Sequence, residues 1–196
     1  YVSPTTGAVI ISLIPLLTPI AAFYYYKERL TKLNLIGLTI SFIGVLFVIL
    51  DVNLSFSASP IGLSFLMLAV FAAIGYSVIL FKVTGRYNII SIITWQNSIG
   101  IFMFLPLFFI FEYEEFKSVE FNFDVLLPLL ELAVFASSIA FILFTYSVKK
   151  IGISRTNMFS NLIPAFTAVF AFIFHGDTME MKVIVGIVLV ISGLYL

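Results

Sequence analysis

The chain has 196 residues, of which 62% are hydrophobic and 10% are charged, and its formal net charge is zero. So few polar residues do not suffice to cover a soluble domain, and a neutral chain gives no indication of nucleic-acid binding. With no cysteine and one histidine, His175, the sequence offers no disulfide, no thiol nucleophile and no cluster of metal ligands.

Seven apolar runs are long enough to cross about 30 Å of hydrocarbon as helices, which takes roughly 20 residues. A segment in lipid must satisfy its own backbone hydrogen bonds, so we expect α-helices. The expected spans, in chain order, are residues 5–26, 34–50, 61–81, 89–111, 125–148, 153–174 and 180–196. The sequence therefore predicts an all-α polytopic membrane helix bundle.

Lysine and arginine are unevenly divided between the two sides that alternate connections must reach. One side receives eight of them: Lys27, Arg29, Lys32, Lys82, Arg86, Lys149, Lys150 and Arg155. The other side receives Lys117 and Lys182. Cytoplasmic connections carry such an excess. We therefore expect KERLTK, FKVTGRYN and KKIGISR to be cytoplasmic in a multi-pass protein of the cell (inner) membrane, with Tyr1 external and Leu196 cytoplasmic.

The sequence around Pro15 recurs 149 residues later around Pro164. Of the 36 aligned positions in residues 12–47 and 161–196, eight are identical. They are Leu13, Ile14, Pro15, Thr18, Ala22, Phe23, Gly37 and Gly44, matched to Leu162, Ile163, Pro164, Thr167, Ala171, Phe172, Gly186 and Gly193. The connection inside the first copy is expected on the cytoplasmic side and that inside the second copy outside. The repeat is therefore inverted in the membrane.

An inverted repeat requires a unit with an odd number of helices. The last five spans, residues 61–196, form one complete unit, whereas residues 1–50 hold only the last two helices of the other. We therefore infer a ten-helix transporter of five plus five helices, in which three further helices precede Tyr1 and seven are visible here. The alternative is a true seven-helix protein in which the similarity arose by chance.

With these features the chain resembles EamA-type members of the drug/metabolite transporter superfamily. The resemblance lies in SPTTGAVIISLIPLLTPIAAFYYYKERL with NLIGLTISFIGVLFVIL, and in GISRTNMFSNLIPAFTAVFAFIFHGDTM with EMKVIVGIVLVISGLYL. Each copy has small residues at the helix start, a proline in the middle, an acidic residue at the end (Glu28 or Asp177) and a closing helix with glycines seven residues apart. HGD stands where the family has Gly-Glu. The resemblance implies two inverted five-helix repeats and small-solute transport by alternating access, often as export, and leaves the solute open.

The span at residues 153–174 carries a polar stripe. Its members, Asn157, Ser160, Asn161 and Pro164, are spaced i, i+3, i+4 and i+7, and so share one helical face. Amides this deep in lipid need partners, which are either a bound solute or a neighbouring helix. The stripe is our first candidate for a solute-binding surface, and interhelical bonding is the alternative.

The first span presents the corresponding face with Ser12 and Pro15, and this face is less polar. Pro15 and Pro164 each remove one helical hydrogen bond and free a carbonyl near the middle of the span. The pair predicts either a kinked gating helix or a static kink. Both Ser12 and Pro15 belong to the candidate binding set.

Polar residues of the middle spans complete the candidate binding set. Trp95 could stack on a planar solute, with a packing or interface role as the alternative, and the neighbouring amides Gln96 and Asn97 could line the solute site. Tyr76 could bond either to a solute or to another helix. Ser138 lies seven residues after an acidic residue of the same span, at the spacing of one helical face.

That acidic residue, Glu131, is the candidate for a coupling-ion site. A carboxylate inside a span costs about 2.5–3.5 kcal/mol on insertion scales, so it is expected to face protein or water. Ser138 and Thr145 follow it at seven-residue intervals. The alternative is that the helix begins near Leu129, so that Glu131 reaches the interface.

Four glycines recur at seven-residue spacing, Gly37 with Gly44 and Gly186 with Gly193. This spacing favours close packing of the spans at 34–50 and 180–196. These are also the least polar spans, so they are the candidates for a peripheral or homodimer-forming pair.

We expect a secondary transporter that moves a small metabolite or drug-like organic solute by alternating access, as an exporter. A seven-helix receptor or a structural membrane protein without transport activity is the alternative. An enzyme is not expected, because the chain has no H-E-x-x-H motif, no cysteine and no paired intramembrane aspartates. The expected partners are a small-molecule substrate and the lipid bilayer, with no nucleic acid, no cofactor and no metal.

Overall fold

The computed structural model describes residues 4–49, 59–119, 122–175 and 180–196. All regular elements in these ranges are helical. The α-helices are α1 (Pro4–Ile11), α2 (Ile14–Tyr26), α3 (Lys32–Ile49), α4 (Pro60–Thr84), α5 (Ile89–Leu107), α6 (Tyr113–Lys117), α7 (Phe123–Glu131), α8 (Ala140–Ile151), α9 (Ile153–Met158), α10 (Leu162–Phe170) and α11 (Met181–Tyr195). Turns of π-helix form η1 (Phe108–Glu112), η2 (Leu132–Ile139) and η4 (Ala171–His175), and η3 (Phe159–Asn161) is a 3₁₀ turn.

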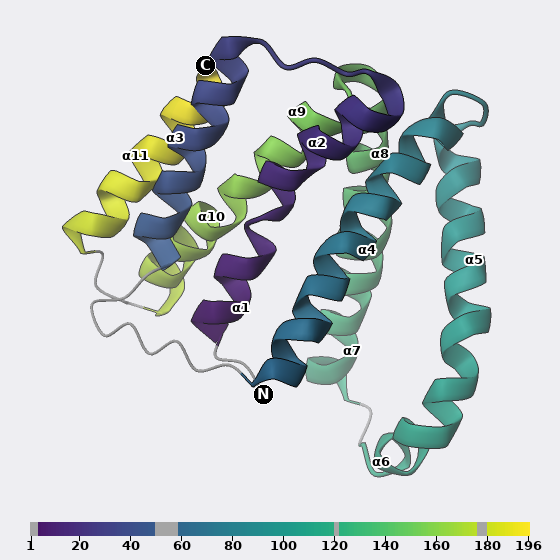
Figure 1. Ribbon diagram of the computed structural model, residues 1–196. Helices are drawn as coiled ribbons and strands as arrows, with labels where there is room; N and C mark the ends of the chain where they lie inside the picture. Colours follow the sequence, from purple (N-terminus) through teal and green to yellow (C-terminus); the bar gives the residue numbers. More distant parts are fainter. Residues whose placement is uncertain (1–3, 50–58, 120–121, 176–179) are drawn as a thin grey trace. The chain divides into compact units, whose positions relative to one another are not determined.

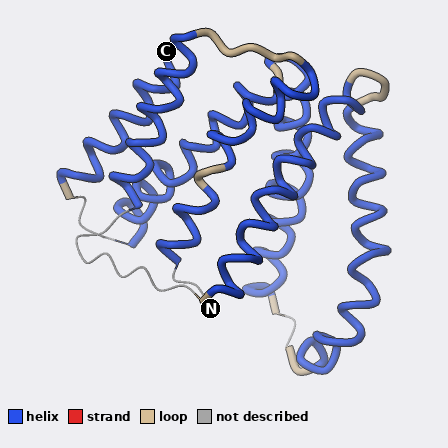
Figure 2. Tube along the Cα trace, in the orientation of Figure 1, coloured by secondary structure: helices blue, strands red, loops and turns tan. Residues whose placement is uncertain are grey.

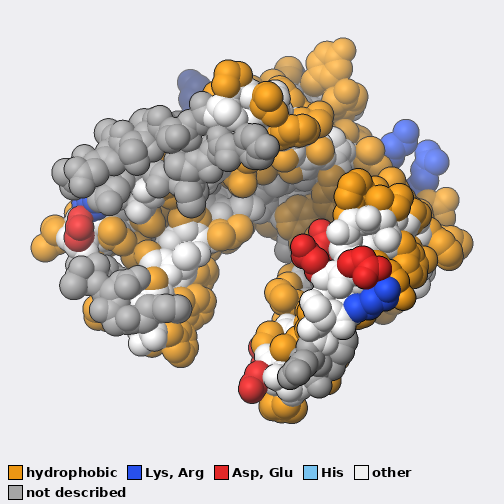
Figure 3. All heavy atoms as spheres, turned by 90° about the horizontal axis from the view of Figure 1, so that it is seen from below, with side chains coloured by type: hydrophobic (Ala, Val, Ile, Leu, Met, Phe, Trp, Pro, Cys, Tyr) orange, Lys and Arg blue, Asp and Glu red, His pale blue; other side chains and the backbone are white. Residues whose placement is uncertain are grey.

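Consecutive helices join into segments of membrane-spanning length. Six are long and apolar enough to cross: Thr6–Tyr26, Lys32–Ile49, Pro60–Thr84, Ile89–Lys117, Phe123–Ile151 and Ile153–Phe174. The seventh predicted span corresponds to the shorter apolar helix Met181–Tyr195. On the face that Figure 3 shows, hydrophobic side chains cover much of the described part, and charged side chains form only a few small groups. The predicted polytopic helical bundle is confirmed.

One predicted loop is helical instead. Residues 112–117 lie beyond the end of the predicted span 89–111, but the helix continues to Lys117. Glutamate and lysine are good helix formers, and the stretch contains neither glycine nor proline. Lys117 Nζ also lies 2.9 Å from Glu114 Oε1, an i,i+3 ion pair of the kind that supports a helix.

The chain divides into two compact units. The first unit comprises Tyr1–Ile79 and Ile151–Leu196, and the second comprises Leu80–Lys150. This division follows packing and passes through α4. The division into repeats, residues 1–50 and 61–196, concerns sequence similarity and stays a prediction.

In the first unit, α3 and α11 lie side by side at their glycines (Figure 1). A Cβ built on Gly44 would lie 2.6 Å from both the Gly186 oxygen and the Val190 nitrogen. A Cβ on Gly37 would meet the Gly193 oxygen, closer still. Backbone therefore touches backbone, and no side chain fits between the two helices.

The glycine contacts are crossed with respect to the repeat. Gly37 corresponds in sequence to Gly186 but lies against Gly193, and Gly44 corresponds to Gly193 but lies against Gly186. An antiparallel pair related by a local two-fold axis produces this exchange of partners. The predicted close packing of the two glycine-bearing helices is thus present in the structure.

The first unit also contains two broken spans. The helical ladder is interrupted at Ser12 and Leu13, between α1 and α2, which Figure 2 shows as a short loop. Pro15 has no N–H to donate, and the Leu16 N–H donates to the Leu13 oxygen. In the last long span the corresponding break is the 3₁₀ turn at Phe159–Asn161, ahead of Pro164. The expected distortion occurs in both copies, one turn before each proline.

The second unit is built from long helices with π-helical turns. Asn88 and Asn122 cap the starts of α5 and α7, with their side-chain oxygens accepting from Ile90 N (2.9 Å) and Val125 N (3.0 Å). In η2 the Ser138 hydroxyl donates to Ala133 O at 3.0 Å, five residues back. Because a π-turn holds more residues than an α-turn, the seven-residue spacing from Glu131 to Ser138 does not place both on one face. That expectation assumed a regular α-helix.

Candidate functional site

Asn157, in α9, is the first member of the polar stripe and is 4% exposed. Its amide nitrogen Nδ2 donates to the Ile153 oxygen of its own helix at 3.0 Å. The same nitrogen lies 3.4 Å from Ser77 Oγ of α4, a longer hydrogen bond between helices. The side chain therefore joins α9 to α4.

Asn161, at the end of η3, is the second amide of the stripe and is 2% exposed. Its Nδ2 donates to Ser41 Oγ of α3 at 3.0 Å. Ser41 lies between Gly37 and Gly44 on the face of α3 that also meets α11. Each buried amide of the stripe is thus paired with a serine of a neighbouring helix in this conformation, which is how a buried polar group in lipid is satisfied.

The other stripe members and the first-span candidates have less polar surroundings. Ser160 and Pro164 are half-buried, and Pro15 is buried. Ser12 is buried as well, and its hydroxyl donates to Val9 O of the preceding turn at 2.6 Å. Ser12 therefore caps the broken end of α1. Tyr76 is half-buried on α4, next to the serine that meets Asn157.

The candidates of the second unit are more exposed. Trp95 is 67% exposed, Asn97 is exposed and Gln96 is half-buried. Glu131 is exposed and Ser138 half-buried. The helix that carries Glu131 begins at Phe123, not near Leu129, which places the carboxylate about 12 Å along the helix at 1.5 Å per residue.

The candidate set is therefore divided between the two compact units. The first unit holds Ser12, Pro15, Tyr76, Asn157, Ser160, Asn161 and Pro164, and the second holds Trp95, Gln96, Asn97, Glu131 and Ser138. Within the first unit, the structure brings the stripe against α3 and α4 through its two amides. The assignment of all these residues to solute binding stays a proposal.

Sequence reasoning assigned no role to the two serines that hold the amides. Ser41 was detectable, because it lies four residues after Gly37 and three before Gly44, on the close-packed glycine face. Ser77 offered a weaker signal, as a small polar residue in a long apolar run. Their partners could not be assigned without the fold, since each hydrogen bond joins residues at least 80 positions apart.

A second missed contact lies where α2 ends and α9 begins. Glu28 Oε1 accepts a hydrogen bond from Ser154 N, in the first turn of α9, at 3.2 Å. Two residues earlier, the Tyr26 hydroxyl donates to the Val78 oxygen of α4 at 2.7 Å. The end of α2 is thus tied to two neighbouring helices.

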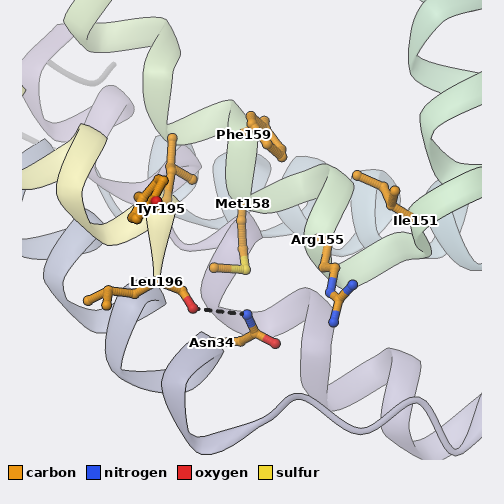
Figure 4. Close-up of a pocket in the computed structure, with 8 residues that line it drawn as sticks. Asn34, Ile151, Arg155, Met158, Phe159, Tyr195 and Leu196 are labelled. Carbon is orange, nitrogen blue, oxygen red and sulfur yellow. Dashed lines mark hydrogen bonds between the residues drawn. The ribbon is translucent and has the colours of Figure 1, made fainter.

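A hollow of about 330 Å³ lies at the same end of the first unit (Figure 4). It is lined by Asn34, Ile151, Arg155, Met158, Phe159, Leu194, Tyr195 and Leu196. Asn34 Nδ2 reaches the backbone oxygen of Leu196 at 3.5 Å. The hollow thus gathers the start of α3, the start of α9 and the end of α11. These three helix ends belong to the side predicted to be cytoplasmic. Among the described residues, no group of three His, Asp or Glu side chains is arranged to hold a metal ion.

Comparison with known proteins identifies the relatives of this chain. The model of the EamA-like transporter family matches residues 1–50 and 60–196. The "Uncharacterized transporter YyaM" of Bacillus subtilis is 30% identical over 198 residues, which cover 98% of this chain and 64% of that protein. An "Uncharacterized transporter" of Archaeoglobus fulgidus is 24% identical over 199 residues, which cover 100% of this chain and 68% of that protein. The "Uncharacterized transporter YetK" of Bacillus subtilis is 25% identical over 201 residues, which cover 100% of this chain and 60% of that protein. The chain thus spans about two thirds of the length of these relatives.

Proposed function

This chain belongs to the EamA-like transporter family, and on that premise we propose that it is a secondary transporter that exports a small metabolite or drug-like organic solute by alternating access. Membrane transport follows from the family and from the apolar helices. The solute class, the direction and the mechanism are the proposal. The names of the relatives state transport without a substrate.

The observation that carries the proposal is the pair of matched breaks. Ser12 and Leu13 align with Asn161 and Leu162, and both spans lose regular α-helix at this place. A break near the middle of a span frees backbone carbonyls and helix ends, which transporters use to hold solutes. Since α2 also packs against α9 (Figure 1), the two broken spans are neighbours.

The buried amides are suited to alternate between two sets of partners. Asn157 and Asn161 each give a hydrogen to a neutral serine hydroxyl. A neutral hydrogen bond contributes only about 1 kcal/mol net, so exchanging one for another costs little free energy. A solute with hydroxyl, carbonyl or amide groups can therefore replace the serines.

The proposed orientation rests on the loop charges. The connections KERLTK, FKVTGRYN and KKIGISR face the cytoplasm of a cell with the protein in its inner membrane. The start of α3, the start of α9 and the end of α11 would then lie on the cytoplasmic side. The complete transporter has ten helices in this proposal, with residues 61–196 as its second five-helix repeat and with homodimerisation through α3 and α11.

A transport assay in vesicles tests the proposed function. Inside-out vesicles that contain the protein are screened for energy-dependent accumulation of polar organic solutes, and the active solute is then tested with Asn157→Ala. We expect at least tenfold slower accumulation, because the solute loses a hydrogen-bond donor in a dry site. The control is Thr39→Ala, which removes an exposed hydroxyl bonded to its own helix. Accumulation of no solute, or equal rates in both variants, would overturn the proposal.

A further inference from the structure

We propose that Glu28 is a gating residue: its carboxylate closes the end of the first unit where α2 ends and α9 begins, and release of its bond to Ser154 opens the solute path to that side. The inference rests on the proposed transport function, since it assigns the contact that separates two access states. It concerns α2, α4 and α9, all of which contribute to the first compact unit.

The turn after α2 directs Glu28 toward α9. Lys27 has left-handed backbone angles, φ 57° and ψ 24°, and its N–H donates to Phe23 O. The N–H of Glu28 donates to Ala22 O, which completes the helix cap. The backbone then leaves the helix, and the Glu28 carboxylate meets the Ser154 N–H at 3.2 Å. This is a charge-assisted hydrogen bond at a helix start, where negative charge is favoured.

Gly152 gives the carboxylate its space. A Cβ at this position would lie 2.8 Å from Glu28 Oε1. The backbone of Gly152, at φ 87° and ψ 173°, also lies in a region that is essentially restricted to glycine. Both the conformation and the packing therefore exclude a side chain where the carboxylate sits. The carboxylate of Glu28 therefore packs closely against the backbone of Gly152, which lies 124 residues later in the chain.

The contact is also incompletely satisfied. Within the described part of the chain, Glu28 Oε2 and Ser154 Oγ are buried without a hydrogen-bond partner. A permanent structural cap would be expected to pair these oxygens, because a buried unpaired acceptor raises the free energy of the state that contains it. The closed state thus has one charge-assisted hydrogen bond and two unpaired oxygens. This balance suits a contact that must both hold and release.

Two further hydrogen bonds complete a ring of three helices. The α2–α4–α9 clamp consists of the bonds Glu28–Ser154, Tyr26–Val78 and Asn157–Ser77. Each pair of helices is joined by one of these bonds, and only the first has an ionisable carboxylate. Ala22, in α2 and six residues before Glu28, is 0% exposed. Access to Ala22 therefore reports on separation of the helix ends.

Cysteine labelling tests the gate directly, because the chain has no native cysteine. Ala22→Cys is introduced alone and with Glu28→Ala, and a membrane-impermeant maleimide is applied to right-side-out and to inside-out vesicles. We expect Glu28→Ala to raise the labelling rate about tenfold, which corresponds to about 1.4 kcal/mol. The increase should occur only from the side of the KERLTK connection. Glu28→Gln, which retains a neutral acceptor oxygen, should give an intermediate rate.

Two controls separate gating from general loosening. Glu115→Gln changes an exposed glutamate in the same way and should leave labelling unchanged. A reporter at Val45, also 0% exposed but in the α3 helix that packs on α11, should stay unlabelled in the Glu28→Ala protein. Equal labelling of Ala22→Cys with and without Glu28→Ala would overturn the proposal, and so would labelling at both reporters or from both sides.

The labelling result is independent of the solute. If Glu28→Ala opens the KERLTK side but the protein moves no solute, the gate stands and the transport function fails. If the protein transports and Glu28→Ala leaves both labelling and transport rate unchanged, the transport function stands and the gate fails.

Discussion

Two interfaces in the first compact unit join helices in opposite ways. Between α3 and α11, glycines two turns apart bring backbone directly against backbone, and neighbouring side chains pack closely around them. Between α2, α4 and α9, each pair of helices is linked by one hydrogen bond that involves Tyr26, Glu28 or Asn157. A close-packed backbone contact loses dispersion energy everywhere when it opens, whereas a hydrogen bond can be exchanged for another. The first interface is therefore suited to be permanent and the second to be switched.

The largest expected effect comes from filling the glycine contact. Gly44→Ala places a methyl group 2.6 Å from the Gly186 oxygen, so α3 and α11 must move apart, at a cost of about 3 kcal/mol. The measurement is the midpoint of thermal unfolding in detergent. Gly100→Ala is the matched control, because a Cβ there meets nothing within 4 Å and the change should stabilise α5 by up to about 1 kcal/mol. Equal midpoints would show that the close approach is not required.

A smaller effect is expected at the border between the two interfaces. Asn161→Ala removes the donor to Ser41, which lies on the glycine face of α3, and should cost about 2 kcal/mol because a buried serine loses its partner. Adding Ser41→Ala should restore part of the loss, since neither polar group is then left unpaired. If Asn161 also binds solute, transport stays low in the double variant although its stability recovers. Recovery of both would assign Asn161 to helix packing alone.

Loss of a single clamp bond should have a modest effect. Tyr26→Phe removes the hydroxyl that donates to Val78 O and should lower stability by about 1 kcal/mol. In the Ala22→Cys background it should raise labelling less than Glu28→Ala does, because the bond is neutral. Tyr24→Phe, at a position 72% exposed, is the matched control. If labelling increases more with Tyr26→Phe than with Glu28→Ala, the main closing contact of α2 is with α4 and not with α9.

The smallest effect on stability is expected at Glu131, which lies outside both interfaces and is exposed. Glu131→Gln should leave the unfolding midpoint unchanged within about 0.5 kcal/mol. If the carboxylate carries a coupling proton, the variant should lose the pH dependence of transport while the neutral solute still binds. Transport at several pH values decides this, with Glu115→Gln as control. An unchanged pH profile would remove Glu131 from the coupling mechanism.

The sequence was most informative where one physical constraint dominated. The length of the apolar runs predicted the spans, because an apolar segment that crosses the bilayer must satisfy its own backbone hydrogen bonds and therefore forms a helix. Prolines predicted the distorted places, and glycine spacing predicted the α3–α11 contact. Regular α-helical periodicity failed after Glu131, because the π-turn at 132–139 leaves no local sequence signal. The partners of Asn157 and Asn161 depended on which helices meet, a tertiary property that spacing along one helix does not contain.

Glu28 illustrates the same limit from another direction. Its repeat counterpart, Asp177, marked the position as part of a recurring pattern, but a charge near the end of a span also reads as an ordinary interfacial residue. The proposed role of Glu28 follows from its contacts with Gly152 and Ser154, which lie more than 120 residues away in the chain. Asp177 itself lies outside the described residues.

The broken first span has a consequence for the way the chain enters the membrane during synthesis. At 1.5 Å per residue, the eight residues of α1 and the thirteen of α2 are each too short to cross about 30 Å of hydrocarbon. Together with Ser12 and Leu13 they form an apolar segment that is long enough. Insertion machinery partitions a segment by its apolar length and composition, so the interruption at Ser12 costs little at that stage. The segment can therefore keep its irregular backbone and still insert into the membrane as a single span.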